Sequence, residues 1–222
     1  MANLKGTSLL VVWADVPQDK EEEFNRFYNE EHMAERLAIP GFLSAARYEA
    51  VLNGPKHLAF YELESPEVLE SPEYMEVRRK PTEWTQRFGP NIVGDPYIRN
   101  TYEMILPTAL NDEISGSGMA PALQIGRMDI PPEREDEWND WYDKIYVPNY
   151  EKVPGVIRGR RFRTIRGEPA YLTVYEFENP DVSKSAEWLR QQNIDPRNEE
   201  LRRVMQHVPG SPGIWKKTFE LS

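Results

Sequence analysis

An internal repeat is the feature of this sequence that most restricts its fold. When the 222-residue chain is shifted against itself by 114 positions, about 65 consecutive residues align without a gap, with about eighteen identities. Chance matching would give only a few. The identities include Tyr28 with Tyr142, Arg47 with Arg161, Tyr61 with Tyr175, and Pro40-Gly41 with Pro154-Gly155. The repeat predicts two copies of one structural unit in a single polypeptide.

Each copy has the same order of secondary-structure signals. In the first copy an apolar run at residues 8–14 predicts a strand, and Pro17 followed by acidic residues predicts a helix that ends at Pro40-Gly41. Two strand-like runs follow, joined by a hairpin signal at residues 52–55. A helical region broken by prolines and a strand at about residues 97–105 complete the copy. This β-α-β-β-α-β order is typical of ferredoxin-like units.

The predicted strands are apolar on both faces. Residues 9–14 are apolar at every position, so both sides of the first strand are expected to be buried. Helices cover only one face of a ferredoxin-like sheet, and the two copies can cover the other by packing sheet against sheet. We therefore predict an α+β fold with two tandem ferredoxin-like repeats, residues 1–106 and 120–222, joined by a flexible linker at 107–119 and forming one α+β barrel with helices outside.

Charge and composition exclude several classes of function. The chain has 27 basic and 37 acidic residues, a net charge of −10, which disfavours binding to nucleic acid or to an anionic membrane surface. The absence of cysteine excludes disulfides, iron–sulfur clusters and cysteine-based zinc sites. The apolar run at residues 9–14 is too short for a signal sequence or a membrane span, so we expect a cytoplasmic protein.

The first copy carries a polar trio that the second copy does not keep. Tyr28, His32 and Arg36 are spaced at four-residue intervals, which places them on one helix face. The second copy has Tyr146 and Tyr150 at the last two positions. A neutral imidazole can accept a proton, a tyrosine can donate to an oxyanion, and an arginine can hold a carboxylate or enolate. The trio is suited to proton transfer next to a carbonyl group.

Structural roles compete with these catalytic ones. His32 also fits a favourable interaction with the helix dipole or a pair with a nearby carboxylate such as Glu31 or Glu35. A tyrosine that both copies keep, such as Tyr28, is more often part of the core. Arg47 can reach into a cavity or pair with Glu62 on the adjacent strand. We favour the ion pair for Arg47, and equally for Arg161 with Glu176, because both copies keep both partners.

We predict four substrate-binding residues and no metal or cofactor. Trp13, Arg47, Tyr48 and Tyr61 could line a pocket that accepts an aromatic molecule, with core packing as the alternative. The three histidines lie in different predicted elements without metal-ligand spacing, so no metal site is expected. His207 is a candidate haem ligand, but Pro209-Gly210 follows it directly, which favours a helix cap over an axial ligand.

One segment of the first copy resembles a known family. Residues 27–42 combine an aromatic-Tyr-x-x-x-His helix with Pro40-Gly41-Phe42, and Ala46-Arg47-Tyr48 follows. This pattern resembles the EthD-like branch of the dimeric α+β barrel superfamily. The resemblance covers both halves for the fold and the first half only for the histidine motif. It implies an intramolecular dimeric α+β barrel. It does not fix the activity, because the superfamily includes monooxygenases, cyclases, isomerases, lyases, haem enzymes and accessory proteins.

These observations lead to one leading function and two alternatives. We expect a cofactor-independent lyase, isomerase or cyclase that acts on an aromatic or carbonyl-bearing metabolite, with His32 as general base or acid and with Tyr28 and Arg36 orienting the substrate. The alternatives are a non-catalytic ligand-binding or accessory protein and, less favoured, a haem-dependent or cofactor-free oxidoreductase. The expected partners are a small-molecule substrate and a second copy of the chain in a homodimer.

Overall fold

Eight antiparallel strands close into a barrel in the computed structural model, which describes residues 3–221. The strand order is β7-β6-β4-β1-β3-β2-β9-β5, and β5 pairs with β7 to complete the circle. A short ninth strand, β8, pairs with β5. The strands are β1 (Ser8–Ala14), β2 (Phe42–Leu52), β3 (His57–Leu63), β4 (Tyr97–Leu106), β5 (Ala122–Asp129), β6 (Val156–Arg166), β7 (Tyr171–Phe177), β8 (Gln206–His207) and β9 (Gly213–Leu221).

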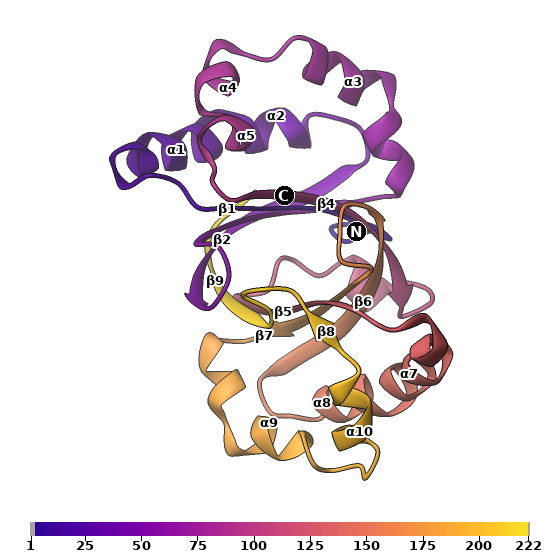
Figure 1. Ribbon diagram of the computed structural model, residues 1–222. Coiled ribbons are helices and arrows are strands. Elements are labelled where there is room, and N and C mark those ends of the chain that lie inside the picture. Colours follow the sequence, from indigo (N-terminus) through magenta and orange to yellow (C-terminus); the bar gives the residue numbers. More distant parts are fainter. Residues whose placement is uncertain (1–2, 222) are drawn as a thin grey trace.

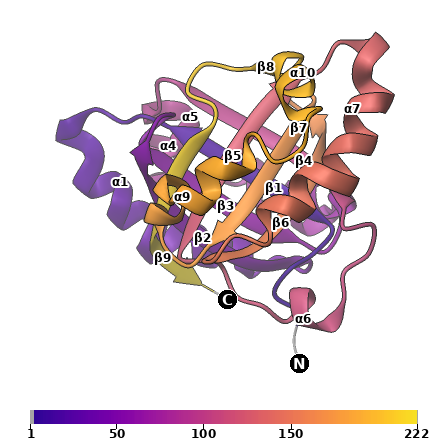
Figure 2. The same ribbon diagram turned by 90° about the horizontal axis from the view of Figure 1, so that it is seen from below.

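The helices of each half lie on opposite outer sides of the barrel (Figure 1). Those of the first half are η1 (Gln18–Lys20), α1 (Glu21–Phe27), η2 (Tyr28–His32), α2 (Met33–Leu37), η3 (Pro66–Glu70), α3 (Pro72–Arg79), α4 (Glu83–Phe88) and α5 (Pro90–Val93). Those of the second half are η4 (Pro132–Arg134), α7 (Glu135–Trp141), η5 (Tyr142–Tyr146), α8 (Val147–Tyr150), η6 (Pro180–Lys184), α9 (Ala186–Gln191) and α10 (Asn198–Arg203). Figure 2 shows α7, α9 and α10 in front of the strands. Among the described residues no helix is long and apolar enough to cross a membrane.

The two halves join through the edges of their sheets. Residues 8–106 form four strands in the order β4-β1-β3-β2, and residues 122–221 form β6-β7-β5-β9. β4 pairs with β6, and β2 pairs with β9. Each half therefore satisfies the edge hydrogen bonds of the other, and the closed barrel leaves neither outer strand of either sheet unpaired. The expected α+β barrel with helices outside is thus what the chain forms.

Alternation along the strands separates the barrel interior from the helix-covered face. On β1 the side chains of Leu9, Val11 and Trp13 point into the barrel, where they pack with residues of both halves. Leu10 and Val12 point outward and pack under the helices of the first half. All seven residues of β1 are buried, so the expectation of two buried faces is confirmed.

The long helix of each half contains a wider turn at the same place. In the first half, α1 passes into the π-helical segment η2 before α2 begins, and in the second half η5 interrupts the helix between α7 and α8. A π-helical turn holds one more residue than an α-helical turn, and such turns are frequent at functional sites. Gly41 lies in the turn between α2 and β2 with φ +91°, a conformation that favours glycine.

The segment at residues 107–119, predicted to be a flexible linker, contains local structure. It includes the single helical turn α6 (Asp112–Ser115). Leu4 N donates a hydrogen bond to Ser115 O at 2.7 Å, and Met119 is buried against the barrel interior. The segment is therefore tied to the barrel at these two points.

A buried charge network links the halves inside the barrel. Arg160 of β6 donates from Nη1 to Glu62 Oε2 of β3 at 3.1 Å and from Nε to Glu176 Oε1 of β7 at 3.1 Å. Lys5 Nζ lies 3.1 Å from Glu176 Oε1. All four side chains are at most 2% exposed. Each buried carboxylate is thus neutralised by cations from elsewhere in the barrel.

This network shows that the predicted pairing of Arg47 with Glu62 is wrong. Arg47 lies opposite Ala59 on β3 and faces outward, whereas Glu62 faces the barrel interior. Arg161 and Glu176 are separated in the same way by the sheet of the second half, since Arg161 bonds to Asn139 on the helix side. Both copies do keep both residues, but strand parity places the partners on opposite faces.

Removing the central cation should destabilise the barrel. We expect Arg160→Ala to lower the free energy of unfolding by about 3 to 5 kcal/mol, because the two buried carboxylates lose the cation that bonds to both of them and Lys5 alone then lies between them. Arg166→Ala is the control, since the Arg166–Glu70 ion pair is exposed and worth about 1 kcal/mol or less. Urea unfolding measures both values. Equal losses for the two variants would contradict the proposed importance of the network.

Candidate functional site

A cavity of about 710 Å³ lies between the first half's sheet and its helices. Leu10 and Val12 of β1 form part of its floor, and α2, α3, α4 and β4 contribute walls. The polar side chains that line it are Tyr28, His32, Arg36, Tyr61, Tyr74, Arg78, Thr85, Gln86, Asn91, Tyr97 and Arg99. The lining of the cavity therefore suits a small molecule that carries both aromatic and polar groups.

Four of the seven predicted site residues meet in this cavity. The polar trio Tyr28, His32 and Arg36 lines it from η2 and α2, and Tyr61 lines it from β3. The trio's alignment on one helix face was expected from the sequence. Its position opposite Tyr61 follows from the packing of η2 on β3.

Trp13 and Tyr48, predicted to bind substrate, lie in the barrel interior instead. Both side chains belong to the interior core, on the opposite face of the sheet from the cavity. The Tyr48 hydroxyl donates to Ala120 O at 3.0 Å, and the Arg127 guanidinium lies 4.6 Å from the Trp13 ring. Odd and even positions of a strand face opposite ways, so residues of this parity on β1 and β2 do not reach the cavity.

Arg47 lies on the helix side of the sheet but outside the cavity. Its guanidinium donates to Asn25 Oδ1 at 2.6 Å and to Asn29 Oδ1 at 3.2 Å, and it stacks 4.9 Å from the Tyr28 ring. Arg161 has the equivalent place over Tyr142 at 4.6 Å. Arg47 therefore supports Tyr28 from behind, and both halves use this support.

His32 is a buried and neutral imidazole. It is 7% exposed and packs against the rings of Phe27 and Tyr28 at 4.9 and 5.0 Å. Burial, together with the nearby Arg36 cation, lowers the pKa of His32 well below its usual value. Its Nδ1 lies 3.9 Å from Glu35 Oε2, too far for a hydrogen bond. The geometry therefore does not support a simple ion pair as the role of His32.

The hydroxyl groups beside His32 are protonated donors. Burial raises the pKa of Tyr28 and of Tyr61 above the usual value for a phenol. The Tyr61 hydroxyl is buried without a hydrogen-bond partner among the described residues. Arg36 contacts Glu35 Oε2 at 3.3 Å and lies 5.8 Å from the Tyr74 ring. The cavity thus holds an acceptor, phenolic donors and a cation close together.

Sequence reasoning missed the residues that complete the cavity. Tyr74 and Arg78 come from α3, Thr85 from α4, and Arg99 from β4. The Arg99 guanidinium donates to the Tyr74 hydroxyl at 2.8 Å. The alignment of Tyr74 with Trp188 in the repeat was the one available signal, because it marked a large aromatic at the same place in both copies.

No acidic side chain among residues 3–221 lines the cavity, although 37 of the 222 residues of the chain are acidic. Three arginines line it, Arg36, Arg78 and Arg99. Neither Arg78 nor Arg99 forms an ion pair with an acidic side chain within residues 3–221. The local field of this cavity is therefore positive in a protein with a net negative charge, which favours an anionic ligand.

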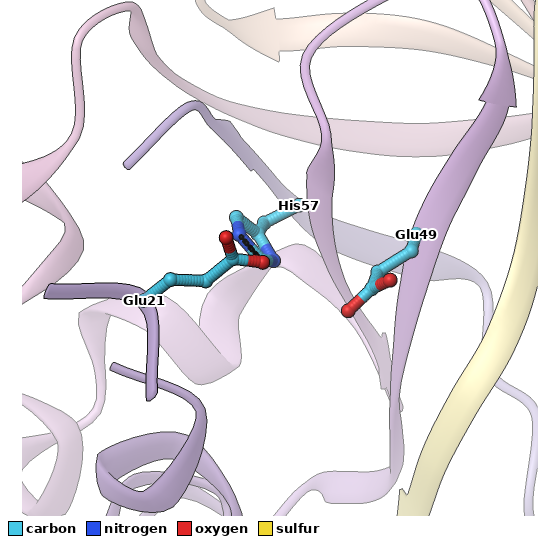
Figure 3. Close-up of side chains that lie close together, drawn as sticks. All are labelled: Glu21, Glu49 and His57. Atoms are coloured by element: carbon cyan, nitrogen blue, oxygen red, sulfur yellow. Dashed lines mark ion pairs between the residues drawn. The ribbon is translucent and has the colours of Figure 1, made fainter. Parts of the chain in front are cut away.

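A second polar cluster lies outside the cavity (Figure 3). Glu21 from α1, Glu49 from β2 and His57 from β3 bring one ligand atom each within 4.8 Å of one another. His57 Nε2 lies 3.5 Å from Glu21 Oε1, and the Lys56 ammonium also contacts that carboxylate. Two carboxylates and a histidine are ligand types that a divalent cation can use.

The surroundings of this cluster disfavour a metal. Arg47 Nη2 lies 3.4 Å from His57 Nδ1, and a guanidinium only donates, so Nδ1 accepts and the ring proton lies on Nε2 toward Glu21. A metal ligand would need the lone pair of Nε2. The second half has Arg163 and Tyr171 in place of Glu49 and His57, and both bond to Glu135. In both halves the side chains at these positions therefore connect the start of the first helix to the strands of the hairpin.

His207 is not at the end of a helix, as the sequence suggested. Helix α10 ends at Arg203, and His207 belongs to β8, where it pairs with Met128. Its side chain is exposed, and Nδ1 lies 3.2 Å from Ser211 Oγ. The cap interpretation is thus wrong because the chain returns to the barrel edge before the Pro209-Gly210 turn.

Comparison with known proteins identifies the fold. No family profile matches the chain, and no curated protein sequence matches it. Solved structures do match. They include an anthrone oxidase-like protein (TM-score 0.64, 15% identity, 99% of this chain and 95% of the other) and a protein from Lactobacillus acidophilus described as a monooxygenase (0.60, 8%, 97% and 96%). A heme-binding protein from Thermus thermophilus also matches (0.56, 11%, 98% and 93%).

These likenesses extend over nearly the whole of both chains in each comparison. They define the protein as an α+β barrel with the fold of dimeric α+β barrel proteins. At such low identity the likeness concerns the fold alone, because proteins of one fold carry out many reactions.

The buried histidines should make stability depend on pH. Burial and the neighbouring Arg47 lower the pKa of His57 to about 4, from 6.5. As the pH falls below 6.5, the histidine of the unfolded chain is protonated before His57 of the folded protein. The contribution of neutral His57 to the free energy of unfolding is therefore complete above pH 6.5 and is lost as the pH falls to the folded pKa of about 4. His57 accounts for a loss of about 3 kcal/mol over this range, and His32 adds a loss of the same sign.

Urea unfolding from pH 7 to pH 4 measures this effect. We expect His57→Gln to lose about 3 kcal/mol less over that range than the wild type, whatever its stability at pH 7. Carboxylates titrate in both proteins and cancel in the difference. A variant with the same pH dependence as the wild type would contradict the low pKa of His57.

Proposed function

We propose that this protein is a small-molecule enzyme that moves a proton next to a carbonyl group of an anionic aromatic metabolite. The observation that carries the proposal is the buried, neutral His32 in a cavity that also holds phenolic donors and arginines but no carboxylate. The reaction is of the lyase, isomerase or cyclase type and is independent of a cofactor. The likeness to enzyme-like barrels of the same fold supports an enzymatic role.

In this proposal His32 accepts the proton from carbon, and hydroxyl donors stabilise the enolate. Tyr28 and Tyr61 are protonated at neutral pH and can donate to the developing oxyanion. Arg36 lies one turn beyond His32 and can hold a carboxylate or the enolate itself. The proton then moves from His32 to another carbon of the substrate, which completes an isomerisation, or to a leaving group whose bond to the substrate breaks with its electron pair, which completes an elimination.

An anionic substrate would also adjust the basicity of His32. In the free protein, burial and Arg36 disfavour the imidazolium. A bound anion beside Arg36 offsets that cation and stabilises a protonated His32, so the pKa of His32 rises when substrate fills the cavity. The substrate would in this way activate the base that acts on it.

We further propose that the chain belongs to the EthD-like branch and arose by duplication of a ferredoxin-like unit. The residue pattern at 27–42 supports the branch, and the equivalent strand orders β4-β1-β3-β2 and β6-β7-β5-β9 support the duplication. Repeats at 1–106 and 120–222, a cytoplasmic location and association into a homodimer belong to the same proposal.

Deuterium exchange tests the chemistry without knowledge of the product. Benzoylacetate, an aromatic 3-oxo acid, should exchange its C–H protons in D₂O faster with the protein than in buffer, as followed by proton NMR. We expect His32→Gln to reduce the enzyme-dependent rate at least about 100-fold, because the proton acceptor is lost. Its melting temperature should stay within about 2 °C of the wild type.

His57→Gln at pH 8 is the matched control, because His57 is also buried but does not line the cavity. It should keep the exchange rate. If the wild type binds benzoylacetate but never accelerates exchange, the non-catalytic ligand-binding function is favoured instead. A large loss of stability in His32→Gln with unchanged exchange would assign His32 a structural role.

A haem-dependent oxidoreductase is the second candidate. It is favoured by the likeness to a heme-binding protein of the same fold and by a neutral imidazole in a cavity with three arginines. Here His32 would hold the haem iron and the arginines would hold the propionates, and the haem would supply the redox chemistry.

Titration with hemin separates the two functions. Because we propose a cofactor-independent reaction, we expect no saturable Soret band. A band that the wild type gives and His32→Ala loses would overturn that proposal and establish haem binding.

A further inference from the structure

The second half encloses a cavity of its own, of about 420 Å³. It lies between β5 and β7 and the helices η5, α8, α9 and α10, at the place equivalent to the first cavity. The shift of 114 positions relates their linings residue by residue. Where the first cavity has Tyr28, His32, Arg36, Tyr61 and Tyr74, the second has Tyr142, Tyr146, Tyr150, Tyr175 and Trp188.

We propose that this cavity is a second ligand-binding site, specific for an aromatic anion, which holds its ligand without proton transfer. The proposal stands on the second half alone and does not depend on the function proposed for the first. Three properties carry it: an aromatic wall, an unpaired cation with orphan hydroxyl groups, and an open floor.

The wall of the cavity is a continuous series of aromatic rings. The ring centroids of Tyr142 and Tyr146 lie 4.8 Å apart, and those of Tyr146 and Tyr150 lie 4.7 Å apart. Trp188 continues the series at 4.3 Å from Tyr150. Ring faces and edges at these spacings offer a flat ligand the offset and edge contacts that aromatic groups prefer.

The polar groups of the cavity favour a negative charge. No acidic side chain lines it, and Arg202 of α10, which is half-buried there, has no acidic partner within residues 3–221. The Tyr175 hydroxyl and Thr173 Oγ1 are buried, line the cavity and have no hydrogen-bond partner among the described residues. A carboxylate could accept from these donors while it neutralises the guanidinium.

Gly126 opens the floor of the cavity. It stands where the first cavity has Val12, and an added Cβ would lie 3.0 Å from the flexible end of Met128 and at the ordinary contact distance of 3.8 Å from His207 Cε1. The strand therefore tolerates a larger residue there, and glycine leaves space for the ligand. A branched side chain at this position would occupy that space.

Among the residues that the structure describes, none places a buried base in this site. Tyr146 replaces His32, and burial raises its pKa well above the usual value for a phenol, so it stays protonated at neutral pH. His207 borders the cavity from β8, but its side chain is exposed and bonds to Ser211. We therefore assign binding, and not turnover, to this half.

Indole NMR signals of the intact ¹⁵N-labelled protein test the proposal with 2-naphthoate as the probe. The Trp188 signal, assigned by its loss in Trp188→Phe, should shift and saturate as 2-naphthoate is added. The neutral analogue 2-naphthamide should bind at least about tenfold more weakly, because it lacks the charge that Arg202 would meet.

Two variants and one control locate the binding. Arg202→Gln should raise the Kd reported by Trp188 about tenfold, and Gly126→Leu should abolish the shift. Arg203→Gln is the control, because Arg203 pairs with Glu199 on the exposed face of α10 and its replacement changes the net charge by the same amount as Arg202→Gln. It should keep the wild-type Kd.

Several results would overturn the proposal. These are an unshifted Trp188 signal at millimolar 2-naphthoate, equal affinity for 2-naphthamide, or equal weakening by Arg202→Gln and Arg203→Gln. If Gly126→Leu fails to fold, the arginine pair and the amide still decide the outcome. Because Trp188 reports only the second half, a failure here is distinguishable from a failure of His32 chemistry.

Discussion

Pairing between the edges of two four-stranded sheets is the constraint on which the rest of the structure depends. The β4–β6 and β2–β9 ladders close the barrel, and closure makes one face of every strand interior. The interior is filled by apolar side chains and by the Arg160 network. Ligand space is therefore found outside the barrel wall, between each sheet and its own helices. Neither of the two cavities lies in the barrel interior, which side chains fill.

The barrel could be predicted from the sequence because it rests on signals that a chain carries locally. The shift of 114 positions revealed the repeat, and apolar residues at consecutive positions of residues 9–14 required cover on both faces. The predictions that failed concern contacts between residues that lie far apart in the sequence. Both copies keep the equivalents of Arg47 and Glu62, yet these two side chains lie on opposite faces of the sheet. Glu62 is instead neutralised by Lys5 of its own half and by Arg160 of the other half. No pattern in a single copy indicates a contact made between copies.

The candidate site was predictable where one helix determines it. Tyr28, His32 and Arg36 were found because helical spacing aligns them, although the π-helical turn η2 left no signal in the sequence. Residues contributed by other elements were missed or misplaced. Tyr74 and Arg99 come together only when α3 packs over β4. Trp13 and Tyr48 were wrongly assigned to the cavity, because the sequence alone does not show which face of a strand turns toward the helices. The absence of carboxylates from both linings likewise appears only in three dimensions.

The presence of both halves on one polypeptide has a consequence for how such a barrel can evolve. In a symmetric dimer of identical chains every substitution occurs twice, so the two ligand sites must remain alike. Here residues 32 and 146 occupy equivalent positions but mutate separately, and they are histidine and tyrosine. One half can thus preserve reactive groups while the other half acquires a different ligand preference. The barrel that the strands of both halves form keeps the backbone of the two sites unchanged.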